Sequence, residues 1–481
     1  MTDRLAALAA GAEAPAELVL DVAGVPTCFR ELEVLRRLDG RRLVLKGTLL
    51  DGPESLAARM PLGAVVLKVF LGSGHRRYFE REAAGLERLE AAGVTTPTRY
   101  YSGSEGQYSL LLLEYLADAA ALQAEDDGGV AGVAELLGRL HKTGCSHGDL
   151  HLDNFLLTRG RIVAIDGDGV TAGARPGTSQ ALNNLAVLAA QRPPIHDDQL
   201  AALLAAYGAG AEVPEPPVAT FQPRLDRARR QRLLRYARKS QRACSEFSVR
   251  RGPGQTTFAL RDGGEPLLEA LLGAEVLVPT EAFLELESLK EGRSATVVRV
   301  PEGYKEDRGV VVKRFNVKDL VHRLRRSLRP MPRYRRAWVF GQLLHFQAIP
   351  TARPLVLMET RQSGLRDVAY LIMEDIGGRT IADEVAELGL SDARIAETCA
   401  LFGLLRRAGF IHGDTKASNF VLHDNRLHVI DLDAMRFAPR GFAARLIAER
   451  RFRADVLRFL ANWADPERQR FADAFSKAGL L

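Results

Sequence analysis

Two segments of the chain, 265 residues apart, carry the same pattern of residues and restrict most strongly what the chain can fold into. Residues 147–155 read HGDLHLDNF, and residues 412–420 read HGDTKASNF. Each segment is followed by an apolar run that ends in aspartate, and in both copies this aspartate lies 17 residues after the His-Gly-Asp aspartate. Because the two copies are much farther apart than the units of a solenoid, the pattern predicts two whole domains of one fold.

The length of 481 residues agrees with two large domains, although about three average domains would also fit. The segments Gly252-Pro253-Gly254 and Gly263-Gly264 are typical of flexible linkers. They place the domain boundary nearby, which predicts domains 1–260 and 261–481. We expect the arginine-rich segment 224–251 to be helical and to belong to the first domain.

The composition is that of a folded globular protein, with 46% hydrophobic and 26% charged residues. The four cysteines are far apart and form no CxxC pair, which favours neither a zinc site nor disulfides. No apolar run reaches the roughly 18 residues that a membrane helix needs, and the short apolar stretch 5–10 is a poor signal peptide. We therefore expect a cytoplasmic protein.

The repeated segment has the residue types that phosphoryl transfer requires. Asp149 and Asp414 are candidates to accept the proton of an attacking hydroxyl. Carboxylate and amide oxygens suit Mg²⁺ bound to nucleotide phosphates. The candidate metal ligands are Asn154 with Asp166 in the first copy, and Asn419 with Asp431 in the second. A turn capped by Asp and Asn is the alternative for a single copy, and two copies with identical spacing make it much weaker.

Each segment is preceded by an apolar strand that carries one lysine, Lys68 in residues 65–70 and Lys313 in residues 310–315. Kinases use a lysine in this position to hold phosphates and a helix glutamate to hold the lysine. An exposed lysine on an edge strand is the alternative, and the position before the repeated segment argues against it. In the first half the helix 80–89 supplies Glu82, with Glu80 in reserve.

The second half repeats this order without the helix glutamate. Alignment of the helix 334–346 places Ala337 where the first half has Glu82, and Asp319 is the only acidic residue between Lys313 and Glu359. Lys313 therefore needs another partner, Asp319 or Asp431, or the second half is a weak or inactive kinase.

The remaining kinase elements are less distinct in the sequence. Glu114, at the end of the strand 110–113, has the character of a hinge beside adenine, and Glu374 is the candidate in the second half. The glycine-rich loop is degenerate in both halves, at residues 46–48 and 290–296.

With these residues in view, the two halves resemble the lipopolysaccharide core kinases, the Kdo and heptose kinase family of Gram-negative bacteria. The segments that carry the resemblance are Lys68, Glu82, 147–154 and 239–247 in the first half, and 312–316, His322, Arg325-Arg326, Leu328–Pro330, Trp338, Pro350-Thr351, 369–371 and 412–414 in the second. The resemblance implies an α+β fold of two tandem protein-kinase-like domains, each with a small β-rich lobe and a larger helical lobe. It also implies ATP and Mg²⁺ as cofactors and a heptose or Kdo hydroxyl of the lipopolysaccharide inner core as acceptor. Because the first half has the complete residue set, we expect ATP and Mg²⁺ to bind between the lobes of the first domain, with Asp149 as the base.

The residue before the first aspartate of each copy argues against a regulated protein kinase. Both copies have glycine there, where such kinases carry an arginine that receives an activation-loop phosphate. Asp168 and Asp433, two residues after the second aspartate of each copy, either add a carboxylate to the metal site or cap a turn.

Two alternative functions remain open. One or both halves, and the second half before the first, could be a pseudokinase scaffold, or the protein is a kinase of the same fold that acts on a small molecule or a protein.

Two segments concentrate positive charge, with eleven Lys and Arg in residues 221–251 and ten in residues 313–336. Polybasic segments are attracted to anionic membranes, so an anionic inner-membrane surface is a candidate partner. No module that binds nucleic acid is recognisable, and we expect no nucleic-acid partner.

Overall fold

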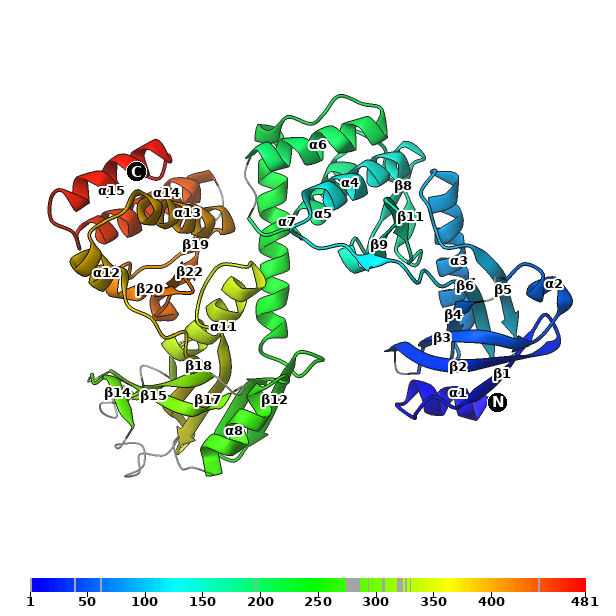
Figure 1. The fold of residues 1–481 in the computed structure, drawn as a ribbon, viewed down its shortest axis with the longest axis horizontal. Helices are drawn as coiled ribbons and strands as arrows, with labels where there is room; N and C mark the ends of the chain where they lie inside the picture. Colours follow the sequence, from blue (N-terminus) through cyan, green and yellow to red (C-terminus); the bar gives the residue numbers. More distant parts are fainter. Residues whose placement is uncertain are drawn as a thin grey trace. The chain divides into compact units, whose positions relative to one another are not determined.

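In the computed structural model, the described residues are 2–38, 40–60, 63–194, 197–273, 286–292, 294–304, 308–317, 323–324, 327–328, 330–439 and 442–481. The chain divides into two compact units, unit 1 (Met1–Arg229) and unit 2 (Arg230–Leu481). Figure 1 shows the elements of each unit in chain order. Within the described residues, no helix is both long and apolar enough to cross a membrane.

Unit 1 begins with a six-stranded antiparallel sheet in the order β1-β2-β3-β4-β6-β5. The strands are β1 (Glu17–Val22), β2 (Val25–Leu38), β3 (Arg42–Asp51), β4 (Ala64–Phe70), β5 (Arg99–Glu105) and β6 (Tyr108–Glu114), with α1 (Thr2–Ala9), α2 (Glu54–Ala57) and α3 (His75–Ala91) around them. Alternate apolar residues of β3, β4 and β6 bury one face of this sheet with α1. The predicted strand with Lys68 and the predicted helix with Glu82 are confirmed as β4 and α3.

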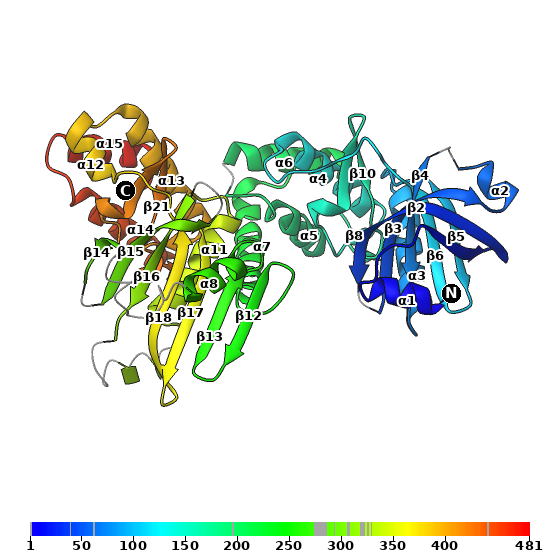
Figure 2. The same cartoon turned by 60° about the horizontal axis from the view of Figure 1, so that its bottom comes forward.

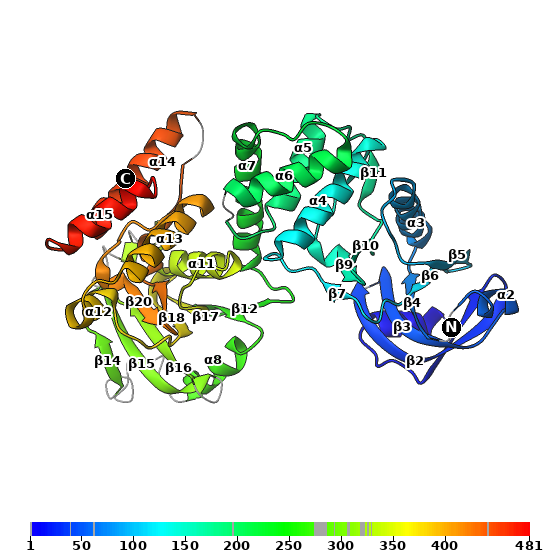
Figure 3. The same ribbon diagram turned by 45° about the horizontal axis from the view of Figure 1, so that its top comes forward.

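The rest of unit 1 is mainly helical. Its elements are β7 (Ala120–Ala121), α4 (Asp127–Lys142), β8 (Cys145–His147), η1 (Leu152–Asn154), β9 (Phe155–Thr158), β10 (Arg161–Ala164), β11 (Val170–Ala172), α5 (Ser179–Ala189) and α6 (Asp197–Ala211). The helices α4 and α6 lie side by side in Figure 3. They approach closely because each has a glycine at the crossing, and a Cβ on Gly210 would lie 2.0 Å from the carbonyl oxygen of Glu135.

The boundary between the units falls inside α7 (Val218–Lys239). Phe221 and Leu225 of this helix are buried in the core of unit 1, and Leu233 and Tyr236 are buried in the core of unit 2. The expectation that residues 224–251 are helical is therefore met only as far as Lys239.

Unit 2 contains a seven-stranded antiparallel sheet in the order β12-β13-β17-β18-β16-β15-β14, which Figure 2 shows with its strands side by side. The elements are β12 (Phe247–Gly252), β13 (Gln255–Leu260), α8 (Gly264–Gly273), β14 (Glu287–Lys290), β15 (Ala295–Tyr304), β16 (Arg308–Phe315), α11 (Arg333–Phe346), β17 (Pro354–Gln362) and β18 (Leu365–Glu374). The five strands β14-β15-β16-β18-β17 follow the order of β2-β3-β4-β6-β5 in unit 1. The lysine strand, β4 or β16, is the third of the five in both units.

The first strands of this sheet revise the expected boundary at residue 260. Residues 255–259 of β13 pair with residues 356–360 of β17, so β12 and β13 extend the sheet of unit 2. The sequence placed these residues in the first domain because the Gly-Pro-Gly signal looked like a linker. In the structure Gly252–Gly254 is the tight turn of the β12–β13 hairpin.

The last part of unit 2 is helical, with two short hairpins. It comprises α12 (Ile381–Leu388), α13 (Asp392–Ala408), β19 (Phe410–Ile411), η2 (Ala417–Asn419), β20 (Phe420–His423), β21 (Arg426–Val429), η3 (Leu432–Ala434), β22 (Arg436–Phe437), α14 (Phe442–Leu460) and α15 (Glu467–Lys477).

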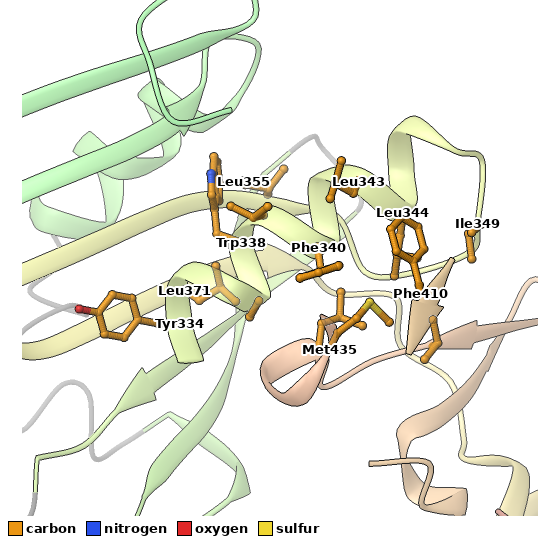
Figure 4. Close-up of a cluster of buried hydrophobic side chains, with 14 of the residues drawn as sticks. Tyr334, Trp338, Phe340, Leu343, Leu344, Ile349, Leu355, Leu371, Phe410 and Met435 are labelled. Carbon is orange, nitrogen blue, oxygen red and sulfur yellow. The ribbon is translucent and has the colours of Figure 1, made fainter. Parts of the chain in front are cut away.

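The core of unit 2 is built around α11, as Figure 4 shows. Trp338 and Leu343 of this helix are fully buried, and Trp338 Nε1 donates a hydrogen bond of 2.9 Å to the carbonyl oxygen of Ser240. Phe340 lies against Phe410, with ring centroids 5.7 Å apart. Each large side chain buried in this way stabilises the fold by about 1.5–3 kcal/mol, so the position of α11 is firmly fixed.

Candidate active site

In unit 1 the strand lysine and the helix glutamate expected from the sequence form a buried pair. The Nζ atom of Lys68 lies 2.5 Å from Oε1 of Glu82 and donates a second hydrogen bond, of 2.7 Å, to the carbonyl oxygen of Ile165. Burial is the largest influence on the pKa of Glu82 and raises it, while the positive charge of Lys68 opposes the rise. The backbone N–H of Gly167 donates a further hydrogen bond to Glu82, which helps to offset the cost of burying the charge.

A third charged side chain joins this pair in unit 1. The guanidinium of Arg42 lies 3.2 Å from Oε2 of Glu82 and 3.9 Å from Oδ2 of Asp166. Burial acts to raise the pKa of Asp166, but the positive charge of Lys68 and the N–H of Asp168 outweigh it and lower the pKa. Arg42 therefore lies close to the carboxylate that the sequence predicts as a metal ligand.

The predicted catalytic loop of unit 1 borders a polar cavity of about 360 Å³. Asn154 Nδ2 donates a hydrogen bond of 2.9 Å to the carbonyl oxygen of Asp149, which brings these two predicted residues together. Arginine, aspartate, glycine and threonine make up the whole lining of the cavity: Arg36, Arg42, Arg81, Gly148, Asp149, Asp166, Asp168, Gly169 and Thr171.

Helix α3 of unit 1 lies directly against the loop that follows Asp166. A Cβ on Gly85 would lie 1.8 Å from the carbonyl oxygen of Gly167, so glycine at these positions permits the contact. The same helix contributes Arg81, whose Nε lies 3.1 Å from Oδ1 of Asp168. Asp168 thus pairs with a helix arginine, a role that neither sequence alternative included.

In unit 2, Lys313 is paired with two carboxylates that follow the second repeat. Its Nζ lies 2.7 Å from Oδ1 of Asp431 and 3.0 Å from Oδ2 of Asp433. Burial acts to lower the pKa of Lys313, but the two carboxylates outweigh it and raise the pKa. Of the two partners expected for Lys313, Asp431 is present, and Asp319 lies outside the described residues. Asp433 was not expected as a partner.

The predicted catalytic loop of unit 2 has the same internal bond as that of unit 1. Asn419 Nδ2 donates a hydrogen bond of 2.8 Å to the carbonyl oxygen of Asp414. Asp431 has φ 59°, a left-handed conformation that costs free energy for a residue other than glycine and is common at functional sites. Asp166, at the corresponding position of unit 1, does not have a positive φ.

The loop of unit 2 is anchored by Asp455, which the sequence analysis missed. Its carboxylate accepts hydrogen bonds of 2.8 and 3.0 Å from the backbone N–H groups of His412 and Gly413, and its carbonyl oxygen accepts one from Thr415. Asp455 lies on α14, 41 residues after Asp414, and no spacing motif links it to the repeat.

Beside Asp414 are two cations. Arg458 Nη2 lies 2.7 Å from Oδ1 of Asp414, and Lys416 Nζ lies 3.5 Å from Oδ2. Both side chains are about half exposed, so the surroundings of Asp414 that face solvent are positively charged. In unit 1 the residue two positions after Asp149 is His151 in place of lysine.

Lys313, Asn419 and Asp431 meet in a cavity of about 560 Å³ in unit 2, a volume suited to a small-molecule ligand or cofactor. Apolar side chains form much of its wall, and Lys313 is grouped there with Asp431 and Asp433. The lining includes Val297, Val311, Ala337, Leu371, Met373, Val421 and Ile430, together with Glu374–Gly378 after β18.

The two predicted hinge glutamates differ in their surroundings. Glu374 lines the cavity of unit 2. The carboxylate of Glu114 in unit 1 accepts hydrogen bonds from the backbone N–H and the hydroxyl of Thr98, at 3.2 and 2.7 Å, so its side chain ties the end of β6 to the residue before β5.

The expected glycine-rich loops also differ. In unit 1, Lys46–Thr48 are not a loop, because they pair with Ala64–Val66 inside the sheet. The hairpin turn between the two strands before the lysine strand, β2 and β3, is at Gly40 instead. In unit 2 the expected stretch does bridge β14 and β15, although Arg293 lies outside the described residues. Of the residues that carried the family resemblance, His322, Arg325, Arg326 and Arg329 also lie outside them.

The residues predicted to hold Mg²⁺ fit a metal that is shared with a nucleotide. Across the described part of the chain, no group of three or more His, Cys, Asp or Glu side chains is arranged to hold a metal by itself. Kinases need only one Asp and one Asn, because the phosphates supply further oxygens. The amide nitrogen of Asn419 is committed to Asp414, which leaves its Oδ1 as the available ligand beside Asp431.

The five-strand order, the buried strand lysine and the Asp–Asn loop give unit 2 the arrangement of a protein-kinase-like fold. Residues 267–450 match the model of the lipopolysaccharide kinase (Kdo/WaaP) family, which confirms the resemblance for this part of the chain. The match does not extend to unit 1, so a tandem repeat of the kinase domain stays a prediction.

Other comparisons are more distant. No curated protein matches the chain. Among solved structures, WaaP in complex with acyl carrier protein is 21% identical, with a TM-score of 0.31, over 41% of this chain and 88% of that one. Choline kinase LicA from Streptococcus pneumoniae is 14% identical, with a TM-score of 0.31, over 45% of this chain and 89% of that one.

Proposed function

We propose that unit 2 transfers the γ-phosphoryl group of ATP to a sugar hydroxyl, heptose or Kdo, of the lipopolysaccharide inner core. The observation that carries this proposal is the cavity of about 560 Å³ that is lined by Lys313, Asn419 and Asp431 together with an apolar wall. The family match over residues 267–450 supports this class of acceptor. The wall accommodates adenine, and the polar end accommodates the phosphates.

In this reaction Asp414 accepts the proton of the attacking hydroxyl. A new bond forms between the acceptor oxygen and the γ-phosphorus, the bond from that phosphorus to the β,γ-bridging oxygen breaks, and ADP leaves. Lys313 binds phosphate oxygens. Asn419 and Asp431 would hold Mg²⁺, which would supply positive charge to neutralise the phosphates. Lys416 and Arg458, beside Asp414, attract a negatively charged acceptor.

Unit 1 has a different role in this proposal, although its Lys68–Glu82 pair is the more conventional one. Arg42 lies beside Asp166 where a metal ion would bind, and the cavity there is smaller and is lined by charged residues, glycine and threonine. We propose that unit 1 does not catalyse phosphate transfer and acts as a pseudokinase scaffold. This reverses the expectation from the sequence, in which the first domain binds ATP and Mg²⁺ and the second half is the weak or inactive one.

The experiment compares Asp414→Asn with Asp149→Asn in the full-length protein. Phosphate transfer from ATP to core lipopolysaccharide is measured, and the core oligosaccharide of a deletion strain is analysed by mass spectrometry. Loss of a general base lowers kcat by about 10²–10⁴-fold, and we expect this for Asp414→Asn alone. Full activity of Asp414→Asn, or unchanged phosphate content in the deletion strain, would overturn the proposal.

Phosphorylation of a small molecule or a protein by the same site is the main rival, and it is tested by offering these acceptors in the same assay. We also propose a cytoplasmic location on the anionic inner-membrane surface, supported by the basic segments. No partner role for nucleic acid is proposed.

A further inference from the structure

The strand lysine of unit 2 has no glutamate to hold it, because α11 contains no acidic residue. We propose that Asp433 is the positioning residue that replaces the missing helix glutamate, and that Arg333 links it to α11. The proposal rests on the proposed function of unit 2 as the catalytic unit. It assigns the residue that keeps Lys313 in place for binding phosphate.

The geometry places Asp433 between the strand and the helix. Its Oδ2 lies 3.0 Å from Nζ of Lys313 and 3.1 Å from Nη2 of Arg333, the first residue of α11. The guanidinium of Arg336, one turn along the helix, donates a hydrogen bond of 3.0 Å to the carbonyl oxygen of Asp433. The strand, the loop and the helix are therefore joined through one residue.

In both units a buried carboxylate lies between the strand lysine and an arginine. In unit 1 the buried carboxylate of Glu82 lies between Lys68 and Arg42. In unit 2 the carboxylate of Asp433, whose side chain is 4% exposed, lies between Lys313 and Arg333. The anion has moved from the helix to the loop, and the second cation, which lies on β3 in unit 1, lies at the start of α11 in unit 2.

Without Asp433, α11 would bring only positive charge towards Lys313. Arg333 and Arg336 would then face the lysine with Asp431 as its one remaining carboxylate among the contacts described. Asp431 is also the predicted metal ligand, so Lys313 would lose its remaining ion pair whenever the carboxylate of Asp431 bound Mg²⁺. Asp433 lets Asp431 bind the metal while Lys313 stays held.

Asp433 could instead act as a second metal ligand, because its Oδ1 is buried with no hydrogen-bond partner among the described residues. This role makes a different prediction. A metal ligand cannot be replaced by a carboxylate on α11, whereas a partner of Lys313 can. Ala337 is the position for such a carboxylate, since it lines the same cavity as Lys313.

The experiment uses the full-length protein and four variants: Asp433→Asn, Asp433→Glu, Asp433→Asn with Ala337→Glu, and the control Asp473→Asn, which changes an exposed carboxylate on α15. ATP affinity is measured by calorimetry, and KM for ATP and kcat are measured at several Mg²⁺ concentrations. Thermal unfolding without ATP reports whether each variant folds.

Asp433→Asn is expected to weaken ATP binding by about 10–100-fold, the usual effect of losing a charge-assisted contact. Ala337→Glu in the same chain is expected to restore at least part of this affinity, and Asp433→Glu to keep much of it. The control is expected to match the wild type.

Three outcomes would overturn the inference: unchanged ATP affinity of Asp433→Asn, no rescue by Ala337→Glu, or a defect that excess Mg²⁺ alone corrects. Wild-type protein that binds ATP but phosphorylates no lipopolysaccharide would instead overturn the proposed function, and the ATP affinities of the variants would still decide the role of Asp433. Wild-type protein that does not bind ATP would overturn both.

Discussion

The carboxylate of Asp414 forms an ion pair of 2.7 Å with Arg458, a residue of α14. The pair joins the predicted catalytic base to a helix that begins 28 residues later in the chain. The arginine side chain is about half exposed, so an acceptor that reaches Asp414 from solvent can also contact Arg458. This relationship suggests that Arg458 takes part in binding the acceptor.

We therefore expect Arg458→Gln to raise KM for core lipopolysaccharide by about 5–10-fold, with little change in KM for ATP, because an exposed charge pair contributes modestly and at one substrate only. Steady-state kinetics with each substrate varied in turn measure both constants. Arg453→Gln, an exposed arginine on the same helix, is the matched control. An equal rise in KM for ATP would contradict the assignment.

The two strand lysines are expected to differ in nucleotide binding. Lys313→Met should weaken ATP affinity by about 10–100-fold, because a charge-assisted contact with phosphate is lost in the larger cavity. Lys68→Met should leave ATP affinity within about twofold, because unit 1 is proposed not to bind the nucleotide, with Arg42 beside Asp166 where a metal ion would lie. Calorimetric titration of both variants tests this, and the reverse order of effects would make unit 1 the nucleotide-binding unit.

Buried histidines predict how stability depends on pH. Burial is the main cause that lowers the pKa of His141, His147 and His412 from its ordinary value. Because the unfolded chain binds protons more readily, stability is full above the unfolded pKa of about 6.5 and is lost as pH falls below it.

Each such histidine contributes a slope of up to about 1.4 kcal/mol per pH unit to the free energy of unfolding. We expect the melting temperature to fall between pH 7.5 and 5.5, and to fall less steeply in His412→Asn. His151→Gln, a change at an exposed site, serves as the control. A slope in His412→Asn as steep as that of the wild type would refute this source of acid sensitivity.

The contact between α3 and the loop after Asp166 predicts a strong effect of one methyl group. Gly85→Ala would place a Cβ 1.8 Å from the carbonyl oxygen of Gly167, and the backbone must move to admit it. We expect a loss of about 1–3 kcal/mol or more in the free energy of unfolding of unit 1, measured by denaturant titration.

Gly128→Ala is the matched control for this change, because its Cβ would make only ordinary contacts on the first turn of α4. It is expected to be neutral or slightly stabilising. If Gly85→Ala were no more harmful than Gly128→Ala, the close approach of helix and loop would be wrong.

Much of the local structure followed from the sequence because its signals are local. The apolar runs around Lys68 and Lys313 predict strands, and the helix with Glu82 has an apolar face at helical spacing. The boundary at 260 and the loop at residues 46–48 differed because glycine marks a tight hairpin or a strand interior as readily as a linker or a phosphate loop.

The sequence by itself determined which residues the repeated segments contain, the order of the main strands and helices, and the absence of a helix glutamate in the second half. Only the tertiary structure decided which charges meet: Arg42 with Asp166, Asp433 with Lys313, and Asp455 with the loop at His412. These partners are up to 124 residues apart, and no pattern along the chain relates them. Packing of α3, α11 and α14 against their loops brings the charges together, and burial then makes each pairing necessary.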